Sequence, residues 1–209
     1  MLKVGLTGSI AVGKSFVLEC FRDFGCHVLD ADKTAREVVA KGSEGLAEII
    51  DKFGSEILSP DGSLDRKKMA AIVFADSEKR ELLNSIVHPR VFAAQNDWLA
   101  NIERDDVDAI AIVDAALMIE SGGYRRFDKL IVVWCESAIQ LKRLMLRDSL
   151  DRETAGQRIA AQLSQDEKKN FADFLIDTSA GLDHTTRQVK EVYDALVSLK
   201  CSDEMDKAP

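Results

Sequence analysis

Chemistry is indicated most clearly by the eight residues Gly8–Ser15, whose sequence is GSIAVGKS. They match the phosphate-binding loop pattern, in which a second glycine, a lysine and a serine follow the first glycine at fixed spacing. An apolar run over residues 2–6 predicts a strand that enters the loop, and a helical pattern predicts a helix that leaves it. Backbone N–H groups at such a helix start bind phosphate oxygens. Lys14 is therefore predicted to reach the β- and γ-phosphates of a nucleotide, and the Ser15 hydroxyl to bind Mg²⁺.

Acidic residues directly follow several predicted strands. Asp30 and Asp32 follow the apolar run Cys26–Leu29, and Asp114 follows the run Ala109–Val113. In an open parallel sheet the ligand crevice lies beyond the carboxyl ends of the strands, so these carboxylates are expected near the phosphate-binding loop. The alternative is that each is a helix cap or a turn residue. For Asp30 and Asp32 as a pair, we favour a role in the site.

Basic residues gather in the segment 140–171, although the chain as a whole has a net charge of −8. Arg143 and Arg147 are four residues apart, which places them on one face of a predicted helix. A site that transfers a phosphoryl group needs added cations, so these arginines are predicted to serve it. The alternative is an ordinary solvated helix surface.

The elements that must position these residues form an alternating pattern. Short apolar runs alternate with helical patterns, which predicts an α/β fold with a parallel sheet and helices on both of its faces. The five runs cover residues 2–6, 26–29, 109–113, 130–134 and 174–176. Two insertions interrupt the alternation, a long helical segment over residues 43–89 and the basic segment 140–171. The last helical pattern ends near Lys200, and residues 201–209 are expected to form a frayed tail.

Composition excludes several classes of protein. Contents of 46% hydrophobic and 31% charged residues are ordinary for a globular protein. The apolar stretch Ala109–Ile119 is interrupted by Asp114 and is too short to span a bilayer. The four scattered cysteines contain no CxxC pair, which predicts a reduced, cytoplasmic protein without a structural metal site. The negative charge argues against a nucleic-acid surface, and no obligate protein partner is inferred.

Beyond the loop, the order and spacing of short motifs along nearly the whole chain resemble the dephospho-coenzyme A kinase family. These motifs are Gly5-Leu6-Thr7-Gly8, Asp30-Ala31-Asp32, Ala35-Arg36, Phe53-Gly54, Asp61-Gly62, Leu64-Asp65-Arg66, His88-Pro89, Leu117 with Glu120, Gln140 with Arg143 and Arg147, Arg158 with Gln162, Ala172-Asp173 and Ile176-Asp177. The resemblance implies a P-loop kinase fold with strand order 2-3-1-4-5, similar to the nucleoside-monophosphate kinases. It also implies ATP-dependent phosphorylation of the ribose 3′-hydroxyl of dephospho-CoA, the last step of coenzyme A biosynthesis.

The same resemblance implies a division of the chain and a role for each site residue. A nucleotide-binding core is expected over residues 1–42, 90–139 and 172–200, a helical substrate subdomain over 43–89 and a lid over 140–171. ATP is expected to contact Gly8, Ala11, Val12, Gly13, Lys14, Ser15 and Phe16. Catalysis is assigned to Lys14, Asp32, Arg143 and Arg147, and substrate binding to Asp30, Asp32, Arg36 and His88. The chain departs from the family at several positions, among them Phe16, where the family usually has serine or threonine, and Thr178, where it usually has asparagine.

Within this scheme Asp32 is expected to be the general base. If strand geometry persists through Asp30 and Asp32, both side chains point the same way, and Asp32 lies further from the sheet and closer to Arg36. Asp30 is then expected to hold a Mg²⁺-bound water or to stabilise the turn. His88 is expected in a loop fixed by Pro89, where it contacts the substrate or serves only as a turn residue.

Two other functions remain open. Another small-molecule P-loop kinase, for example one acting on a nucleoside monophosphate, would carry the same loop, although the Asp-Ala-Asp and His-Pro motifs favour the coenzyme A precursor. A nucleotide-switched binding protein of the GTPase type would need an Asn-Lys-x-Asp motif, and the chain has no Asn-Lys pair. The segment Asp51–Gly54 matches the DxxG pattern of such proteins, but it follows a helical pattern and not a strand.

Overall fold

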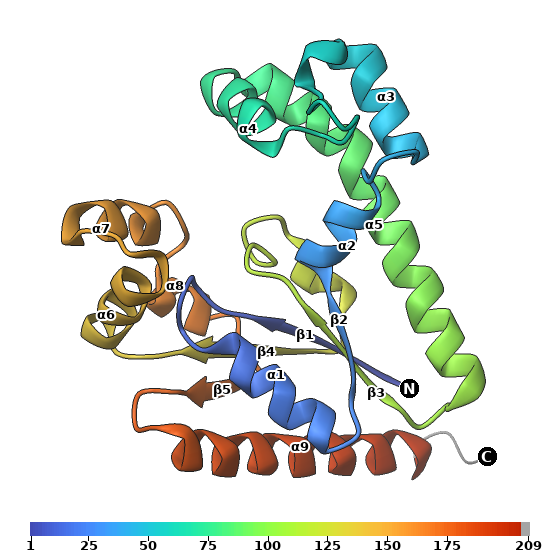
Figure 1. Ribbon diagram of the computed structural model, residues 1–209. Helices are drawn as coiled ribbons and strands as arrows, with labels where there is room; N and C mark the ends of the chain where they lie inside the picture. Colours follow the sequence, from blue (N-terminus) through green and yellow to red (C-terminus); the bar gives the residue numbers. More distant parts are fainter. Residues whose placement is uncertain (206–209) are drawn as a thin grey trace. The chain divides into compact units, whose positions relative to one another are not determined.

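A parallel sheet of five strands forms the centre of the fold (Figure 1). The computed structural model describes residues 1–205, with side chains described as far as Lys200. The strands are β1 (Leu2–Thr7), β2 (His27–Asp30), β3 (Ile110–Asp114), β4 (Lys129–Trp134) and β5 (Phe174–Asp177). Their order in the sheet is β2-β3-β1-β4-β5, which confirms the predicted order and the α/β class.

Helices connect the strands, as the alternating pattern predicted. They are α1 (Lys14–Asp23), α2 (Ala31–Glu37), α3 (Glu44–Phe53), α4 (Arg66–Ala75), α5 (Ser77–Asp105), α6 (Ser137–Asp148), α7 (Arg152–Ala160), α8 (Gln165–Lys169) and α9 (Leu182–Met205), with short 3₁₀ turns η1 (Ser55–Ile57) and η2 (Gly123–Arg126). Helix α9 continues to Met205, beyond Lys200, where the frayed tail was expected to begin. Residues 206–209 of that expected tail lie outside the described residues. Within the described part of the chain, no helix combines the length and the apolar character needed to cross a membrane.

The chain divides into two compact units. The first contains residues 1–29 and the chain from Ile102 onward, and the second contains residues 30–101. The second unit is therefore longer than the predicted substrate subdomain, residues 43–89, which lies within it. The predicted lid, residues 140–171, belongs to the first unit together with the phosphate-binding loop.

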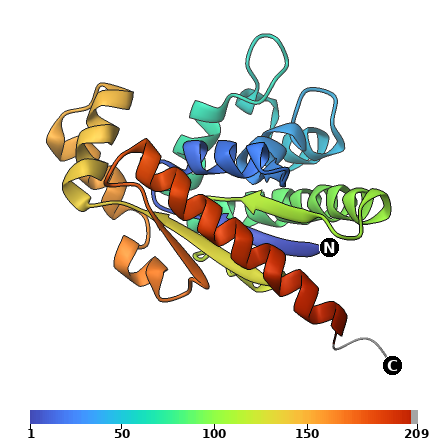
Figure 2. The ribbon, with the colours of Figure 1, turned by 90° about the horizontal axis from the view of Figure 1, so that it is seen from below.

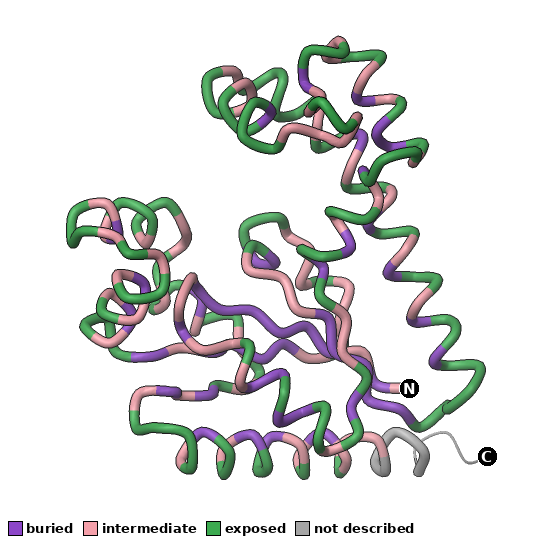
Figure 3. Tube along the Cα trace, viewed as in Figure 1, coloured by how far each residue is buried: buried purple, intermediate pink, exposed green. Residues whose placement is uncertain are grey.

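The core of the first unit lies between the sheet and the pair of helices α1 and α9. Alternate residues of β1, Leu2, Val4 and Leu6, are buried in this cluster, as expected for one face of a strand. Phe21 of α1 and Leu196 of α9 are fully buried against it. Figure 2 shows α9 running across the sheet beside α1, and Figure 3 shows the buried strands above these two helices in that view. This packing fixes the start of α1, and with it the loop that precedes the helix.

Helix caps and a separate apolar core define the second unit. The side chain of Asp30 accepts a hydrogen bond from the backbone N–H of Lys33 and caps α2, and Ser43 and Asp65 cap α3 and α4 in the same way. The core cluster joins α3 and α4 to η1, α5 and the segment after α2, and it contains Val39, Ile49, Ile57, Met69 and Ile86. The unit therefore has its own hydrophobic centre, as expected for an independent subdomain.

Candidate active site

The two glycines of the phosphate-binding loop are required by its backbone path. Residues 8–13 connect the end of β1 to the start of α1. A Cβ atom at Gly8 would lie 2.4 Å from the carbonyl oxygen of Val133 in β4, so any larger residue would clash. Gly13 has a φ of +93° and caps α1 in the left-handed region, which glycine adopts without steric cost. The sequence pattern is therefore explained by the close approach of the sheet on one side and by the helix start on the other.

Lys14 and Ser15 stand at the positive end of α1. The Nζ atom of Lys14 donates a hydrogen bond to the carbonyl oxygen of Gly8 at 3.0 Å, so the ammonium group lies over the loop. Ser15 is exposed in the first turn of the helix. Phe16 packs its ring against the core, so only its backbone N–H is left to face a ligand. The helix start thus offers one ammonium group, one hydroxyl and backbone donors to an anion.

Arg143 and Thr178 form a contact between α6, the loop after β5 and the phosphate-binding loop. The Nη1 atom of Arg143 donates to Thr178 Oγ1 and the Nη2 atom to the Thr178 carbonyl oxygen, each at 2.8 Å. Thr178 Oγ1 in turn donates to the carbonyl oxygen of Val12 at 2.6 Å. Cys135 is buried beside this contact, and burial raises the pKa of its thiol, which makes the group a poor nucleophile at neutral pH. Thr178, which departs from the family pattern, is therefore a structural link to the loop.

Arg147 has a different environment, although it lies on the same helix. Its side chain is 54% exposed and binds Asp148, with 2.8 Å between Nε and Oδ1. Asp148 also accepts a hydrogen bond from Arg158 at 2.9 Å. The hydrogen bonds from Arg147 and the charges of both arginines lower the pKa of the Asp148 carboxyl. Arg147 and Arg158 therefore meet at one carboxylate, while Arg143 is directed to Thr178.

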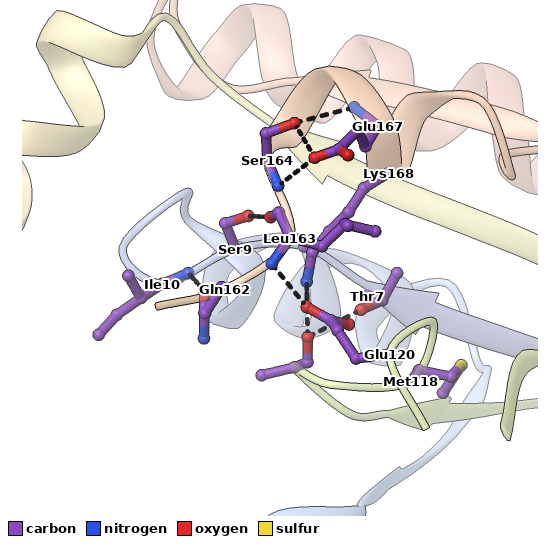
Figure 4. Close-up of polar contacts among 12 residues, drawn as sticks. Thr7, Ser9, Ile10, Met118, Glu120, Gln162, Leu163, Ser164, Glu167 and Lys168 are labelled. Carbon is purple, nitrogen blue, oxygen red and sulfur yellow. Dashed lines mark hydrogen bonds and ion pairs between the residues drawn. The ribbon is translucent and has the colours of Figure 1, made fainter. Parts of the chain in front are cut away.

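An ion pair with a fully buried lysine lies next to the loop (Figure 4). The side chain of Lys168 in α8 is fully buried, and its Nζ atom lies 2.8 Å from Glu120 Oε1 and 2.9 Å from the carbonyl oxygen of Ala116. Thr7, at the end of β1, donates a hydrogen bond to the carbonyl oxygen of Ala115 at 2.8 Å. The segment after β3 is thus attached both to β1 and to the end of the lid. Sequence reasoning placed Lys168 in the basic run and Glu120 in a motif, but it gave no signal that the two residues pair.

We expect the two members of this pair to differ in their effect on stability. Glu120→Ala leaves the fully buried Lys168 ammonium without its carboxylate, and it should lower the free energy of unfolding by about 3–5 kcal/mol. Lys168→Met leaves Glu120, which is 24% exposed and reaches water, so its cost should be smaller. Urea unfolding of both variants measures the difference. A larger loss for Lys168→Met would contradict this account of the pair.

The predicted substrate residues lie in the second unit. The expectation that strand geometry continues through Asp32 is wrong, and so is the expectation of a loop at His88. Strand geometry ends at Asp30, because α2 begins at Ala31 and Asp30 caps it through a 2.9 Å hydrogen bond from the N–H of Lys33. Asp32 is exposed in the first helical turn, and residues two apart on a helix do not share a direction. Arg36 follows one turn later on the same helix and is also exposed. The expectation that Asp30 stabilises the turn is confirmed by its cap.

His88 was expected in a loop, and it lies inside a helix. Both His88 and Pro89 belong to α5, which continues to Asp105. The imidazole ring is exposed, with its centroid 6.0 Å from that of Phe92. Proline lacks the N–H of a helical hydrogen bond, yet the helix continues because Ile86 and Val91 on either side of it are buried. Proline therefore did not mark a loop at this position.

Comparison with known proteins assigns the chain to a family. The family model described as dephospho-CoA kinase (CoaE) matches residues 2–184. A dephospho-CoA kinase from Listeria innocua is 43% identical over 200 residues, which cover 94% of this chain and 98% of the relative. The chain belongs to the dephospho-CoA kinase family.

Solved structures agree with this assignment to the dephospho-CoA kinase family. The dephospho-CoA kinase of Campylobacter jejuni is 28% identical with a TM-score of 0.71, covering 94% of this chain and 97% of that one. A Thermus thermophilus structure is 29% identical with a TM-score of 0.80, covering 93% and 97%. The predicted P-loop kinase fold is confirmed, and so is the predicted activity, ATP-dependent phosphorylation of dephospho-CoA in coenzyme A biosynthesis.

Proposed function

We propose that the chain transfers the γ-phosphoryl group of ATP to the ribose 3′-hydroxyl of dephospho-CoA. The observation that carries this proposal is the strand–loop–helix unit Leu2–Asp23, with Lys14 over the loop, in a chain of the dephospho-CoA kinase family. The backbone N–H groups of Gly8 and of residues 11–16 bind the phosphates, and the ammonium of Lys14 stabilises charge that develops between the β- and γ-phosphates. Positioning and charge neutralisation supply most of the catalysis in such a reaction.

Mg²⁺ is the proposed metal ion. The Ser15 hydroxyl is exposed at the start of α1, and the half-buried Asp114 carboxylate ends β3 opposite Leu6 of β1. These are oxygen donors of the kind that Mg²⁺ prefers, and Mg²⁺ is commonly held by one or two protein groups together with substrate phosphates. When bound, the ion neutralises charge on the phosphate oxygens.

The acceptor hydroxyl needs a base, and we propose Asp32 for this role. Its carboxylate takes the hydroxyl proton as the ribose oxygen bonds to the γ-phosphorus and the bond to the β-bridging oxygen breaks, which releases ADP. Arg36 and His88, both exposed in the second unit, are proposed to bind dephospho-CoA. Asp30 contributes through the cap that starts α2 and orients Asp32.

An apolar cavity in the second unit supports its proposed role as the substrate subdomain. The cavity has a volume of about 290 Å³. Its lining includes Ala35, Val39, Ile49, Leu64, Met69 and Val87. Arg66 also belongs to the lining, so a charged side chain stands beside an apolar wall. This combination suits dephospho-CoA, which joins phosphate groups to a long uncharged arm.

Arg143 and Arg147 are proposed to act on the transferring phosphoryl group when the lid, residues 140–171, closes over ATP. Removing a cation that acts only in the transition state lowers kcat and kcat/KM together. We expect Arg147→Ala to do this, because its exposed side chain pairs with the Asp148 carboxylate, and exposed pairs of this kind contribute little to stability. Arg143→Ala should also raise the KM for ATP, because it removes the contact with Thr178 beside the loop. Steady-state kinetics separate the two patterns, and a rise in KM alone for both variants would assign them to binding only.

One experiment tests the overall proposal. The purified chain is incubated with Mg-ATP and dephospho-CoA, and CoA is sought by chromatography, with nucleoside monophosphates as alternative acceptors. We expect CoA and ADP in equal amounts, with the phosphate on the 3′-oxygen. Absence of CoA beside robust phosphorylation of another acceptor would overturn the proposal. We also propose a cytoplasmic location, supported by the free thiols of Cys20, Cys26 and Cys135.

A further inference from the structure

Both backbone hydrogen-bonding groups of Ile10, in the middle of the phosphate-binding loop, are held by glutamine side chains. The N–H of Ile10 donates to Gln162 Oε1 at 2.8 Å, a contact visible in Figure 4. The carbonyl oxygen of Ile10 accepts a hydrogen bond from Gln140 Nε2, also at 2.8 Å. Glutamine supplies an acceptor and a donor at its amide, so this one residue type satisfies the two opposite requirements.

The two glutamines come from separate parts of the lid, residues 140–171. Gln140 lies near the start of α6 and is only 1% exposed, whereas Gln162 is half-buried in the turn between α7 and α8. Gln165 fixes the orientation of the first amide, since its Nε2 atom donates to Gln140 Oε1 at 2.8 Å while its Oε1 atom accepts from the N–H of Cys135 at 2.9 Å. The lid is therefore attached to the loop at its start, in α6, and again after α7.

These contacts bear on the least favourable backbone position in the loop. Ala11 has a φ of +61°, in the left-handed region, where a residue with a Cβ atom is sterically disfavoured. Ile10, on one side of it, is held by Gln140 and Gln162, and the carbonyl of Val12, on the other side, is held by Thr178. A backbone conformation of this kind persists only when its surroundings determine it.

We propose that Gln140 and Gln162 are positioning residues that hold the phosphate-binding loop in the shape required for the β-phosphate. The inference rests on the proposed role of residues 8–16 in ATP binding. Neither amide has to touch the nucleotide, because both act through the peptide groups of Ile10. Since both belong to the lid, the placement of the lid and the shape of the loop are coupled.

The test compares ADP with AMP, because only ADP places a β-phosphate in the loop. Gln162→Met keeps the length of the side chain and removes the acceptor for the Ile10 N–H. We expect it to weaken ADP binding by about threefold to tenfold, the range for one lost hydrogen bond, while AMP binding stays unchanged in calorimetry. Gln157→Met is the matched control, because Gln157 is exposed in α7 and its side chain contacts Glu153 of the same helix.

Two further variants make the result specific. Gln162→Ala removes the same acceptor without a new apolar side chain, so agreement with Gln162→Met assigns the effect to the lost hydrogen bond. In the double variant of Gln140→Met and Gln162→Met, the loss of ADP affinity should differ from the sum of the single losses, because both act on Ile10.

The outcomes separate this inference from the proposed function. If both Gln162 variants keep the original ratio of ADP affinity to AMP affinity, the inference is overturned, but the proposed function is not. Equal loss of ADP and AMP binding would also overturn it, since that result indicates a general structural effect. Equal affinity of the unaltered chain for ADP and AMP would contradict the phosphate-binding role of the loop, and the inference with it.

Discussion

Asp32→Asn should lower kcat by about 10²–10⁴-fold, the contribution typical of a general base, while the KM for dephospho-CoA changes little. The substitution keeps the shape of the side chain and its exposed position in the first turn of α2, but it removes the proton acceptor. A carboxylate whose only task was to bind substrate would change KM instead. Steady-state kinetics with dephospho-CoA as the varied substrate measure the difference.

Asp30→Asn is the matched control for this prediction. Asparagine caps a helix as well as aspartate does, so the hydrogen bond to the N–H of Lys33 and the start of α2 should both survive. Its kcat should therefore remain within a few-fold of the original, and its thermal unfolding should be nearly unchanged. If Asp30→Asn abolishes turnover and Asp32→Asn does not, the roles of the two carboxylates are reversed.

Local patterns predicted the framework of the site because they depend on short-range physics. The apolar run of β1 reflects the burial of that strand. The glycines at 8 and 13 reflect the backbone path that the loop and the helix start require. Sequence alone therefore located the phosphate-binding loop. The order of the strands in the sheet came from the family resemblance, because periodicity does not specify which strands are neighbours. Both were confirmed.

One error reflects tertiary contacts that overrule a local rule, and the other reflects a local helix cap. Pro89 predicted a loop, but α5 passes through it, and Arg90 just beyond it donates to the carbonyl of Ile86 and pairs with Glu48 of α3 at 2.7 Å. Asp32 was expected to continue a strand, but the cap at Asp30 starts a helix one residue later. At Pro89 the deciding interactions come from the surrounding fold, whereas at Asp32 they come from the cap at Asp30, which is local in the sequence.

The contacts around the loop could not be predicted for a related reason. Lys168 belongs to a basic run, and charged runs usually lie on solvated surfaces, yet this lysine is fully buried against Glu120. Gln140 and Gln162 were noted only as parts of a motif, and their shared partner, Ile10, is distant from both in sequence. Pairing at such separation depends on how the lid packs on the sheet, which no periodicity encodes.

Lys14→Met should lower kcat by about 10²–10³-fold or more, because the ammonium group stabilises charge that develops during transfer. Methionine keeps most of the apolar stem, so the packing of α1 on α9 should be preserved and thermal unfolding should change little. Loss of the 3.0 Å hydrogen bond to the Gly8 carbonyl should also weaken ATP binding, but by a much smaller factor than the loss in kcat.

Lys190→Met is the control for this substitution. Lys190 is exposed on α9 and pairs with Asp194 one turn away. Exposed ion pairs of this kind contribute little to the stability of the fold. The control therefore makes the same chemical change without touching the loop, and it should keep full turnover. Turnover of Lys14→Met within tenfold of the original would refute the catalytic assignment. A large loss of ATP binding with unchanged kcat at saturation would restrict Lys14 to holding the nucleotide, since an interaction that is equally strong in the ground state and the transition state lowers KM only.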